Sequence, residues 1–218
     1  MALSDGSVIH GDAVVVASEA WATAPLVGPI DARLGELVSA IPCSSSATIA
    51  LAYRAEDCPF DRHWHGILSP AVEKLTVTGV TLMSSKWPGR APDGRVLLRG
   101  FVGGPRDQAV MGKSDQEIVA IVREQLAGLL GIPVSAQPLF TRVYRWQGGM
   151  PQYTMGHLDR VDEIERIVAG IPGLALAGGA YRGVGVPNCL DSGEAAASKV
   201  MGDLGIAFSE EGSGARLY

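Results

Sequence analysis

The stretch that decides the fold is Leu174-Ala-Leu-Ala-Gly-Gly-Ala-Tyr-Arg-Gly-Val-Gly-Val-Pro-Asn-Cys-Leu-Asp-Ser-Gly-Glu-Ala-Ala-Ala197. Its first four residues predict a short buried strand, the glycines a turn, and the remainder a helix that ends before Gly205. Asn188 is the expected N-cap of that helix, with Asp191 as the partner in an imperfect capping box. Gly193 and Ala197 would leave a shallow helix face that can lie close to a sheet or ligand.

The glycines of this turn, at positions 178, 179, 183 and 185, remove side chains where the backbone enters the helix. Backbone N–H groups at the positive end of a helix dipole suit an anion or the electron-rich edge of a cofactor. The same pattern is equally typical of an ordinary strand-to-helix connection. The turn alone leaves both interpretations open.

Composition places the chain among globular proteins, with 218 residues, 47% hydrophobic content, 19% charged residues and a net charge of −5. Clustered Lys and Arg are lacking, which excludes a general nucleic-acid surface. Cys43, Cys58 and Cys189 lack metal-ligand spacing. We therefore expect these cysteines to be small, buried apolar side chains in a reducing compartment and to bind no metal. We see no signal peptide and no apolar run of ~18 residues, and therefore expect a cytoplasmic protein, with peripheral membrane contact left open.

Along the chain, residues 1–17 predict a hairpin with a turn at Asp5-Gly6 and a buried strand over residues 12–17. A strand that is apolar throughout expects neighbours on both sides, so we expect the chain to be a piece of something longer. Pro25, Gly28 and Pro29 predict a linker. Further strands are expected over residues 46–53, 66–69, 76–83, 96–102 and 136–146, and helices over 32–40, from 114 onward and over 159–169. The helix from Ser114 begins with a capping box to Glu117.

Four strands in succession predict a mostly antiparallel sheet within an α+β or α/β fold, and the two apolar strands outside it are expected to pair with each other.

His63-Trp-His65 lacks a third metal ligand, so we predict a loop there and no metal site. Ser44-Ser-Ser46 lacks a nucleophile elbow. Trp87, which we expect to end an extended run, and Trp146 are each compatible with a core position or a ligand contact.

Three stretches together resemble oxygen-dependent protoporphyrinogen oxidase, within the flavin-containing amine-oxidase superfamily. They are Ser84-Ser-Lys-Trp-Pro-Gly-Arg-Ala-Pro-Asp-Gly-Arg-Val-Leu-Leu-Arg-Gly-Phe-Val-Gly103, Met150-Pro-Gln-Tyr-Thr-Met-Gly-His157 and Gly178-Gly-Ala-Tyr-Arg-Gly-Val-Gly-Val-Pro-Asn-Cys-Leu-Asp-Ser-Gly193. The opening Gly11-Asp-Ala-Val-Val-Val-Ala-Ser18 is similar as well. Their order matches the C-terminal half of the family, over residues 8 to about 205.

The resemblance implies an FAD-dependent, six-electron oxidation of protoporphyrinogen IX to protoporphyrin IX, with O₂ reoxidising the flavin. It places Val184, Gly185, Val186 and Trp146 at the flavin. Leu68 and Trp87 match apolar positions that sandwich the tetrapyrrole substrate, although plant members often carry Phe at the position of Trp87. No residue is assigned a catalytic role.

The resemblance also divides the chain into a partial FAD-binding domain (1–30), a substrate-binding domain (31–147), a C-terminal FAD-binding segment (148–206) and a tail (207–218). The sequence contains no strand–GxGxxG–helix unit, which family members use to bind the FAD pyrophosphate. We therefore expect a C-terminal portion of such an enzyme that cannot hold FAD tightly or turn over alone. Alternatives are another flavin amine-oxidase-like enzyme, or a non-catalytic module that binds a tetrapyrrole or a partner chain, including a second copy of itself.

Overall fold

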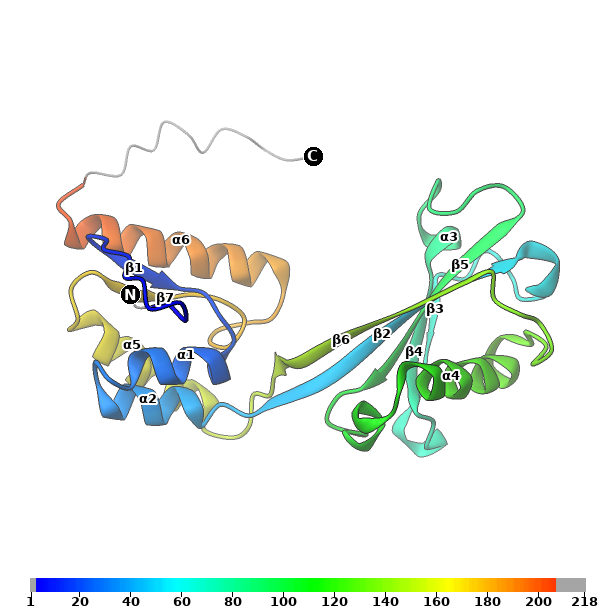
Figure 1. The fold of residues 1–218 in the computed structure, drawn as a ribbon, viewed down its shortest axis with the longest axis horizontal. Coiled ribbons are helices and arrows are strands. Elements are labelled where there is room, and N and C mark those ends of the chain that lie inside the picture. Colours follow the sequence, from blue (N-terminus) through cyan, green and yellow to red (C-terminus); the bar gives the residue numbers. More distant parts are fainter. Residues whose placement is uncertain (1–2, 207–218) are drawn as a thin grey trace. The chain divides into compact units, whose positions relative to one another are not determined.

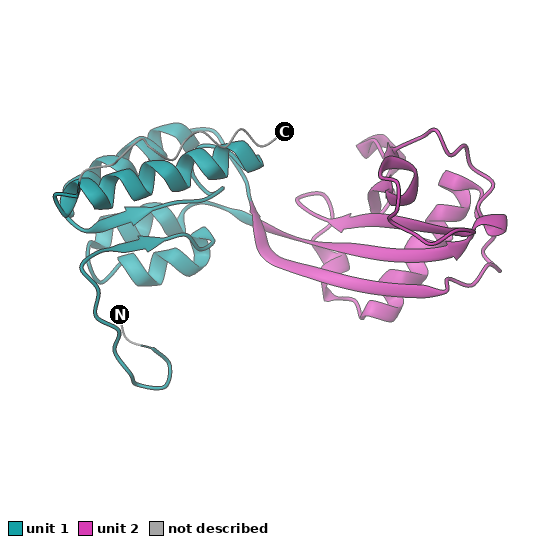
Figure 2. Ribbon diagram, turned by 90° about the horizontal axis from the view of Figure 1, so that it is seen from above, with its two compact units in different colours: residues 1–43, 151–218 teal, residues 44–150 magenta. Residues whose placement is uncertain are grey.

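The computed structural model describes residues 3–206, and the expected tail at 207–218 lies outside them. The chain forms two compact units, unit 1 comprising residues 1–43 and 151–218 and unit 2 comprising residues 44–150 (Figure 2). Residues 31–43, which the resemblance assigned to the middle domain, pack in unit 1. The reason is that Leu34, Leu37 and Val38 are buried in the same core as Val161 and Ile164.

Unit 1 is a two-stranded sheet between helices. Its elements are β1 (Val14–Val16), α1 (Ala20–Val27), α2 (Ala32–Ser39), α5 (His157–Ala169), β7 (Leu174–Leu176) and α6 (Val186–Asp203). β1 and β7 pair in parallel, with Val14 opposite Leu174, which confirms that the two apolar strands belong together. Helix α6 lies on one side of this sheet, and α1, α2 and α5 lie on the other (Figure 1).

The predicted N-terminal hairpin is wrong. A turn forms as expected, since Gly6 N–H donates to Leu3 O at 3.0 Å. β1, however, has three residues and pairs with β7 instead of with an earlier strand. Val14 and Val15 are 44% and 43% exposed, because the described sheet has only two strands to cover them.

The predicted linker at residues 25–29 is also wrong, because Pro25 lies inside α1. The glycine that suggested a linker serves a helix contact instead. A Cβ added to Gly35 of α2 would lie 2.7 Å from the Cα of Gly28, so the two glycines let α1 and α2 touch through their backbones.

Unit 2 contains a five-stranded sheet in the order β3-β4-β5-β2-β6. Its elements are β2 (Cys43–Arg54), β3 (Gly66–Leu68), β4 (Val77–Leu82), α3 (Met83–Lys86), β5 (Arg95–Gly103), α4 (Asp115–Leu130) and β6 (Phe140–Pro151), with short 3₁₀ turns at Ala55–Asp57, Ala71–Glu73 and Ala109–Gly112. The β2–β5, β3–β4 and β4–β5 pairs are antiparallel, which confirms the mainly antiparallel sheet. α3 occupies the end of the run that we expected to be extended.

Helix α4 covers one face of this sheet. It begins with the predicted capping box, in which Ser114 Oγ accepts from Glu117 N–H at 3.3 Å and Ser114 N–H donates to Glu117 Oε2 at 2.8 Å. Its stripe of Ile118, Val122 and Leu126 is fully buried in the core of unit 2. No helix within residues 3–206 has the length and apolar character needed to cross a membrane.

The burial of β2 alternates along its length, so the two faces of the sheet are distinct. Ala47, Ile49, Leu51 and Tyr53 are buried in the core with α4. Successive strand side chains point to opposite faces, so Thr48, Ala50 and Ala52 lie on the other side. We call that side, with the side chains in register on the neighbouring strands, the open face.

Candidate functional site

The glycine-rich turn ends at α6, whose N-cap is Gly185 and not Asn188 as predicted. Asn188 lies in the first turn of the helix, and its side chain folds back beneath the loop. A Cβ on Gly183 would lie 2.5 Å from Asn188 Cγ, and one on Gly185 would lie 2.7 Å from Asn188 Oδ1. These glycines are required because the Asn188 side chain fills the space that their own side chains would need.

Aromatic side chains that precede α5, or begin it, hold this turn in place. Tyr153 Oη donates to Gly179 O at 2.6 Å, and His157 Nε2 lies 2.7 Å from Tyr181 O. The two rings stack, with centroids 4.1 Å apart. Since a carbonyl can only accept, His157 Nε2 carries a proton there. Both residues lie in the stretch Met150–His157 that carries the family resemblance, but no role was predicted for either of them.

Tyr181 is 5% exposed, and burial raises the pKa of its hydroxyl to about 12. Burial also raises the pKa of Tyr153. Both phenols therefore stay protonated near neutral pH.

The helix face that packs on β7 contains Ala196 in place of the predicted Gly193. Ala196 is buried with Ala175, Ala177 and the partly buried Val200, whereas a Cβ on Gly193 would meet no atom within 4 Å. At the start of α6, the side chains of Val184, Val186 and Leu190 are 57%, 75% and 68% exposed. The expected flavin position therefore presents backbone amides and apolar side chains together to solvent.

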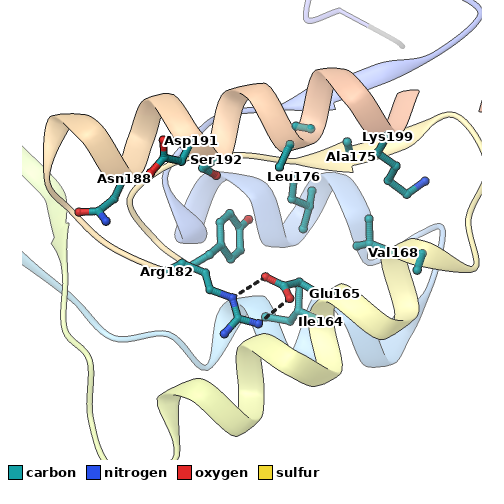
Figure 3. A pocket seen from close by; sticks show the side chains of 14 residues that line it. Ile164, Glu165, Val168, Ala175, Leu176, Arg182, Asn188, Asp191, Ser192 and Lys199 are labelled. Carbon is teal, nitrogen blue, oxygen red and sulfur yellow. Dashed lines mark hydrogen bonds and ion pairs between the residues drawn. The ribbon is translucent and has the colours of Figure 1, made fainter. Parts of the chain in front are cut away.

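A cavity of about 450 Å³ lies in unit 1 between α5, β7 and α6 (Figure 3). Its lining includes Ile164, Val168, Leu176, Ser192 and Lys199, but not Val184, Gly185 or Val186. Because Ala177 N–H donates to Val16 O and Val14 N–H donates to Gly173 O, alternate residues of β7 face β1. The N–H and C=O of Leu176 consequently point away from β1.

The Arg182 guanidinium closes one end of this cavity (Figure 3). It donates to both Glu165 carboxylate oxygens, at 2.9 and 2.6 Å, and to Asp162 Oδ1 at 2.6 Å. The hydrogen bonds to Glu165 and then to Asp162 raise the pKa of Arg182. Gly178 N–H donates to Ser192 Oγ at 3.0 Å, which connects the turn to the α6 wall of the cavity.

In unit 2, the register brings Leu68 and Trp146 into one row across the open face. Leu68 is opposite Gly79, Gly79 is opposite Phe101, and Phe101 is opposite Thr48. Trp146 Nε1 then lies 3.5 Å from Thr48 Oγ1. The two predicted residues occupy opposite edge strands, about 19 Å apart at ordinary strand spacing, with small or flat side chains between them.

Trp87 ends α3 and is 38% exposed. Lys86 Nζ lies 4.6 Å from the centroid of its ring, so its aromatic face is engaged in a cation–π contact. Among residues 3–206, no three His, Cys, Asp or Glu side chains gather as a metal site would require. His63 instead bonds Asp61, with Nδ1 and Oδ1 at 2.8 Å.

Comparison with known proteins places these features in a family. The family model for flavin containing amine oxidoreductases matches residues 1–201. The chain is 32% identical over 200 residues to coproporphyrinogen III oxidase of Bacillus subtilis, covering 91% of this chain and 42% of that protein. It is 26% identical to the chloroplastic protoporphyrinogen oxidase of rice, Oryza sativa subsp. japonica, covering 88% of this chain and 37% of that protein.

A solved structure from Exiguobacterium sp. 255-15, described there as a protoporphyrinogen oxidase, superimposes with a TM-score of 0.73 and 28% identity. The match covers 89% of this chain and 42% of that one. The chain therefore spans less than half the length of these relatives. The match of the family model over residues 1–201 includes all of unit 2 and most of unit 1, and the chain belongs to the family of flavin containing amine oxidoreductases.

Proposed function

We propose that this chain is the C-terminal portion of an FAD-dependent oxidase that converts a porphyrinogen to the corresponding porphyrin with O₂. The observation that carries the proposal is the start of α6, where a glycine-rich turn leads into a helix N-terminus beside exposed apolar residues, in a chain whose residues 1–201 match the family of flavin containing amine oxidoreductases. Relatives named for coproporphyrinogen III and for protoporphyrinogen IX support the class of substrate.

The residues at the turn fit a flavin. Gly183 and Gly185 keep the backbone bare, and the Val186 and Asn188 amides lie in the first turn of α6, where N–H groups have no helical partner. Pro187 has no N–H, so the amides of Gly185, Val186 and Asn188 are the donors at the helix start. Bound FAD would accept the electrons removed from the porphyrinogen and pass them to oxygen.

This chain's residues would bind and shield the reacting partners. Val184, Gly185 and Val186 would hold the flavin edge, while Tyr153 and His157 keep the loop in shape by bonding its carbonyls. In unit 2, Trp146 would contact the flavin, and Leu68 and Trp87 would contact the tetrapyrrole. Apolar contacts of this kind exclude water from a site whose hard chemistry belongs to the cofactor.

The β7 edge supports the further proposal that the chain alone does not hold FAD tightly. Within residues 3–206, the backbone of Leu176 has no strand partner on the side away from β1, and Leu176 lines a cavity between helices α5 and α6. This setting is suited to another parallel strand. A segment that the longer relatives possess would supply this strand together with the pyrophosphate-binding motif. Without it, the turn at α6 offers only one edge of a cofactor site.

Two experiments test the proposal. Purified chain mixed with FAD and desalted should retain no stoichiometric flavin absorbance, and a retained flavin spectrum would contradict the dependence on a further segment. A chimera should then join the remaining segment of the Bacillus subtilis relative to this chain in place of the matched region. We expect it to bind flavin and to form fluorescent porphyrin from a porphyrinogen. A flavin-loaded chimera that forms none would refute the oxidase assignment.

A further inference from the structure

The five-stranded sheet is positively charged on a chain that is negative overall. Strands β2 to β6 contain no Asp or Glu, yet the whole chain has a net charge of −5. They contain Arg54, Arg95, Arg99, Arg142 and Arg145. Arg145 points to the α4 side, where it donates to Asp115 Oδ1 at 2.6 Å and to Met111 O at 2.9 Å.

The other arginines lie on the open face. Arg54 and Arg95 are opposite each other at one end of the β2–β5 pair, and Arg54 is 3.8 Å from Glu56. Arg142 is two residues from Tyr144 and four from Trp146, so strand alternation places it on the same face as Trp146. Its guanidinium lies 5.9 Å from the Tyr144 ring centroid. No ion pair within residues 3–206 neutralises Arg99 or Arg142.

Arg99 occupies the centre of the open face. It lies on the middle strand β5, opposite Ala50 on β2 and Thr81 on β4. Both cross-strand neighbours are small and Arg99 is exposed, and the row beside it contains Leu68, Phe101 and Trp146. An arginine with no carboxylate partner in a field of apolar and small side chains is suited to an anionic group attached to an apolar body.

We propose that Arg99 is a specificity-determining residue that binds a carboxylate of the tetrapyrrole, with Arg142 as a second cationic contact. The proposal rests on the proposed function, because it takes the open face as the surface on which the porphyrinogen lies. It favours a substrate with a carboxylate on every pyrrole ring, as in coproporphyrinogen III, over one with carboxylates on two neighbouring rings, as in protoporphyrinogen IX.

The placement of the charges is the reason for this preference. β5 and β6 flank β2, so Arg99 and Arg142 lie on strands that are two strand spacings apart, about 10 Å across the sheet, and Arg95 lies further along β5. A ligand whose carboxylates lie along a single edge would leave some of these cations without a partner. A ligand with carboxylates around its whole periphery can engage cations on more than one strand at once.

The test is equilibrium binding of stable porphyrins to the purified full chain. Binding is measured by the quenching of tryptophan fluorescence, with all ligands in the same detergent buffer. The ligands are coproporphyrin III, protoporphyrin IX and the uncharged tetramethyl ester of coproporphyrin III. Arg99→Met keeps the apolar stem and removes the charge, whereas Arg99→Lys keeps the charge. Arg166→Met, at an exposed position of α5 in unit 1, is the matched control for loss of one positive charge.

We expect Arg99→Met to weaken coproporphyrin III binding about tenfold and protoporphyrin IX binding by less than about threefold, the range for a partly exposed charge-assisted hydrogen bond. Arg99→Lys should retain most of the preference, Arg166→Met should change neither affinity, and the ester should be insensitive to all three. Equal losses for both porphyrins, or none, would overturn the role of Arg99 while leaving the porphyrinogen assignment intact. Failure of every porphyrin to bind the unmodified chain would overturn the open face as the porphyrin-binding surface, and with it the role of Arg99, whereas the chimera tests the oxidase assignment separately.

Discussion

Replacing Tyr181 with phenylalanine should make unit 1 more resistant to alkaline unfolding. The Tyr181 side chain is 5% exposed, and burial raises its pKa from 10.0 to about 12, offset only in part by the nearby Thr23 hydroxyl. In the unfolded chain, the phenol returns to its ordinary pKa of about 10. Between these two values, the unfolded state loses a proton that the folded state retains, so the free energy of unfolding falls as pH rises.

The size of the effect follows from the width of that window. Each pH unit contributes about 1.4 kcal/mol, so the full two-unit difference removes roughly 2 to 3 kcal/mol by pH 12. Below pH 10 the contribution is fully present and independent of pH. Because the Tyr181 hydroxyl makes no hydrogen bond of ordinary geometry, Tyr181→Phe should change stability near neutral pH by less than about 1 kcal/mol.

The assay is urea unfolding, monitored by circular dichroism, at neutral pH and at several values between pH 10 and pH 12. Tyr144→Phe is the control, since Tyr144 is 49% exposed. The buried Tyr53, whose pKa burial also raises, is present in every variant and cancels from the comparison. Absorbance titration of phenolate should show a late step that is missing in Tyr181→Phe. Equal alkaline losses in the unmodified chain and in Tyr181→Phe would refute the burial argument.

Other substitutions test the turn, the core and the helix cap through urea unfolding. Gly183→Ala should destabilise unit 1 by about 1 to 3 kcal/mol, because the added methyl group overpacks against Asn188. Gly193→Ala adds a methyl group in open space and should stabilise α6 by about 0.5 to 1 kcal/mol. A Gly183→Ala variant as stable as the unmodified chain would contradict the close packing. Leu126→Ala should cost unit 2 about 2 to 5 kcal/mol through a cavity, and a loss below 1 kcal/mol would show that the site collapses. Ser114→Ala should cost about 1 kcal/mol and increase amide exchange in the first turn of α4, and unchanged exchange would argue against the cap.

Much of unit 2 could be predicted because its patterns are local. The alternation in residues 46–53 and 96–102 marks strands with one buried face, and Ser114 with Glu117 marks a helix start. The turn before α6 was also located from its glycines. Its N-cap was misassigned, because Asn188 favours caps by propensity while Gly185 occupies that position and the Asn188 side chain packs beneath the loop.

The helix α1 could not be predicted, because Pro25 and Gly28 favour a break unless α2 packs against them. The pairing of β1 with β7, about 160 residues away in the sequence, was predicted because both strands are apolar, but its parallel register was not. The Tyr153 and His157 contacts with the turn are likewise long-range. A tyrosine and a histidine before a helix have no distinctive spacing that would reveal them.

The sequence by itself determined the family resemblance, the strand and helix content of unit 2 and the position of the glycine-rich turn, since each depends on neighbouring residues. Only the tertiary structure decided that β1 and β7 leave one strand edge facing a cavity, and that Leu68 and Trp146 share a row across one sheet face. It also placed Arg99 at the centre of that face. Strand register decides which side chains meet, and register is a property of pairing between segments distant in the chain.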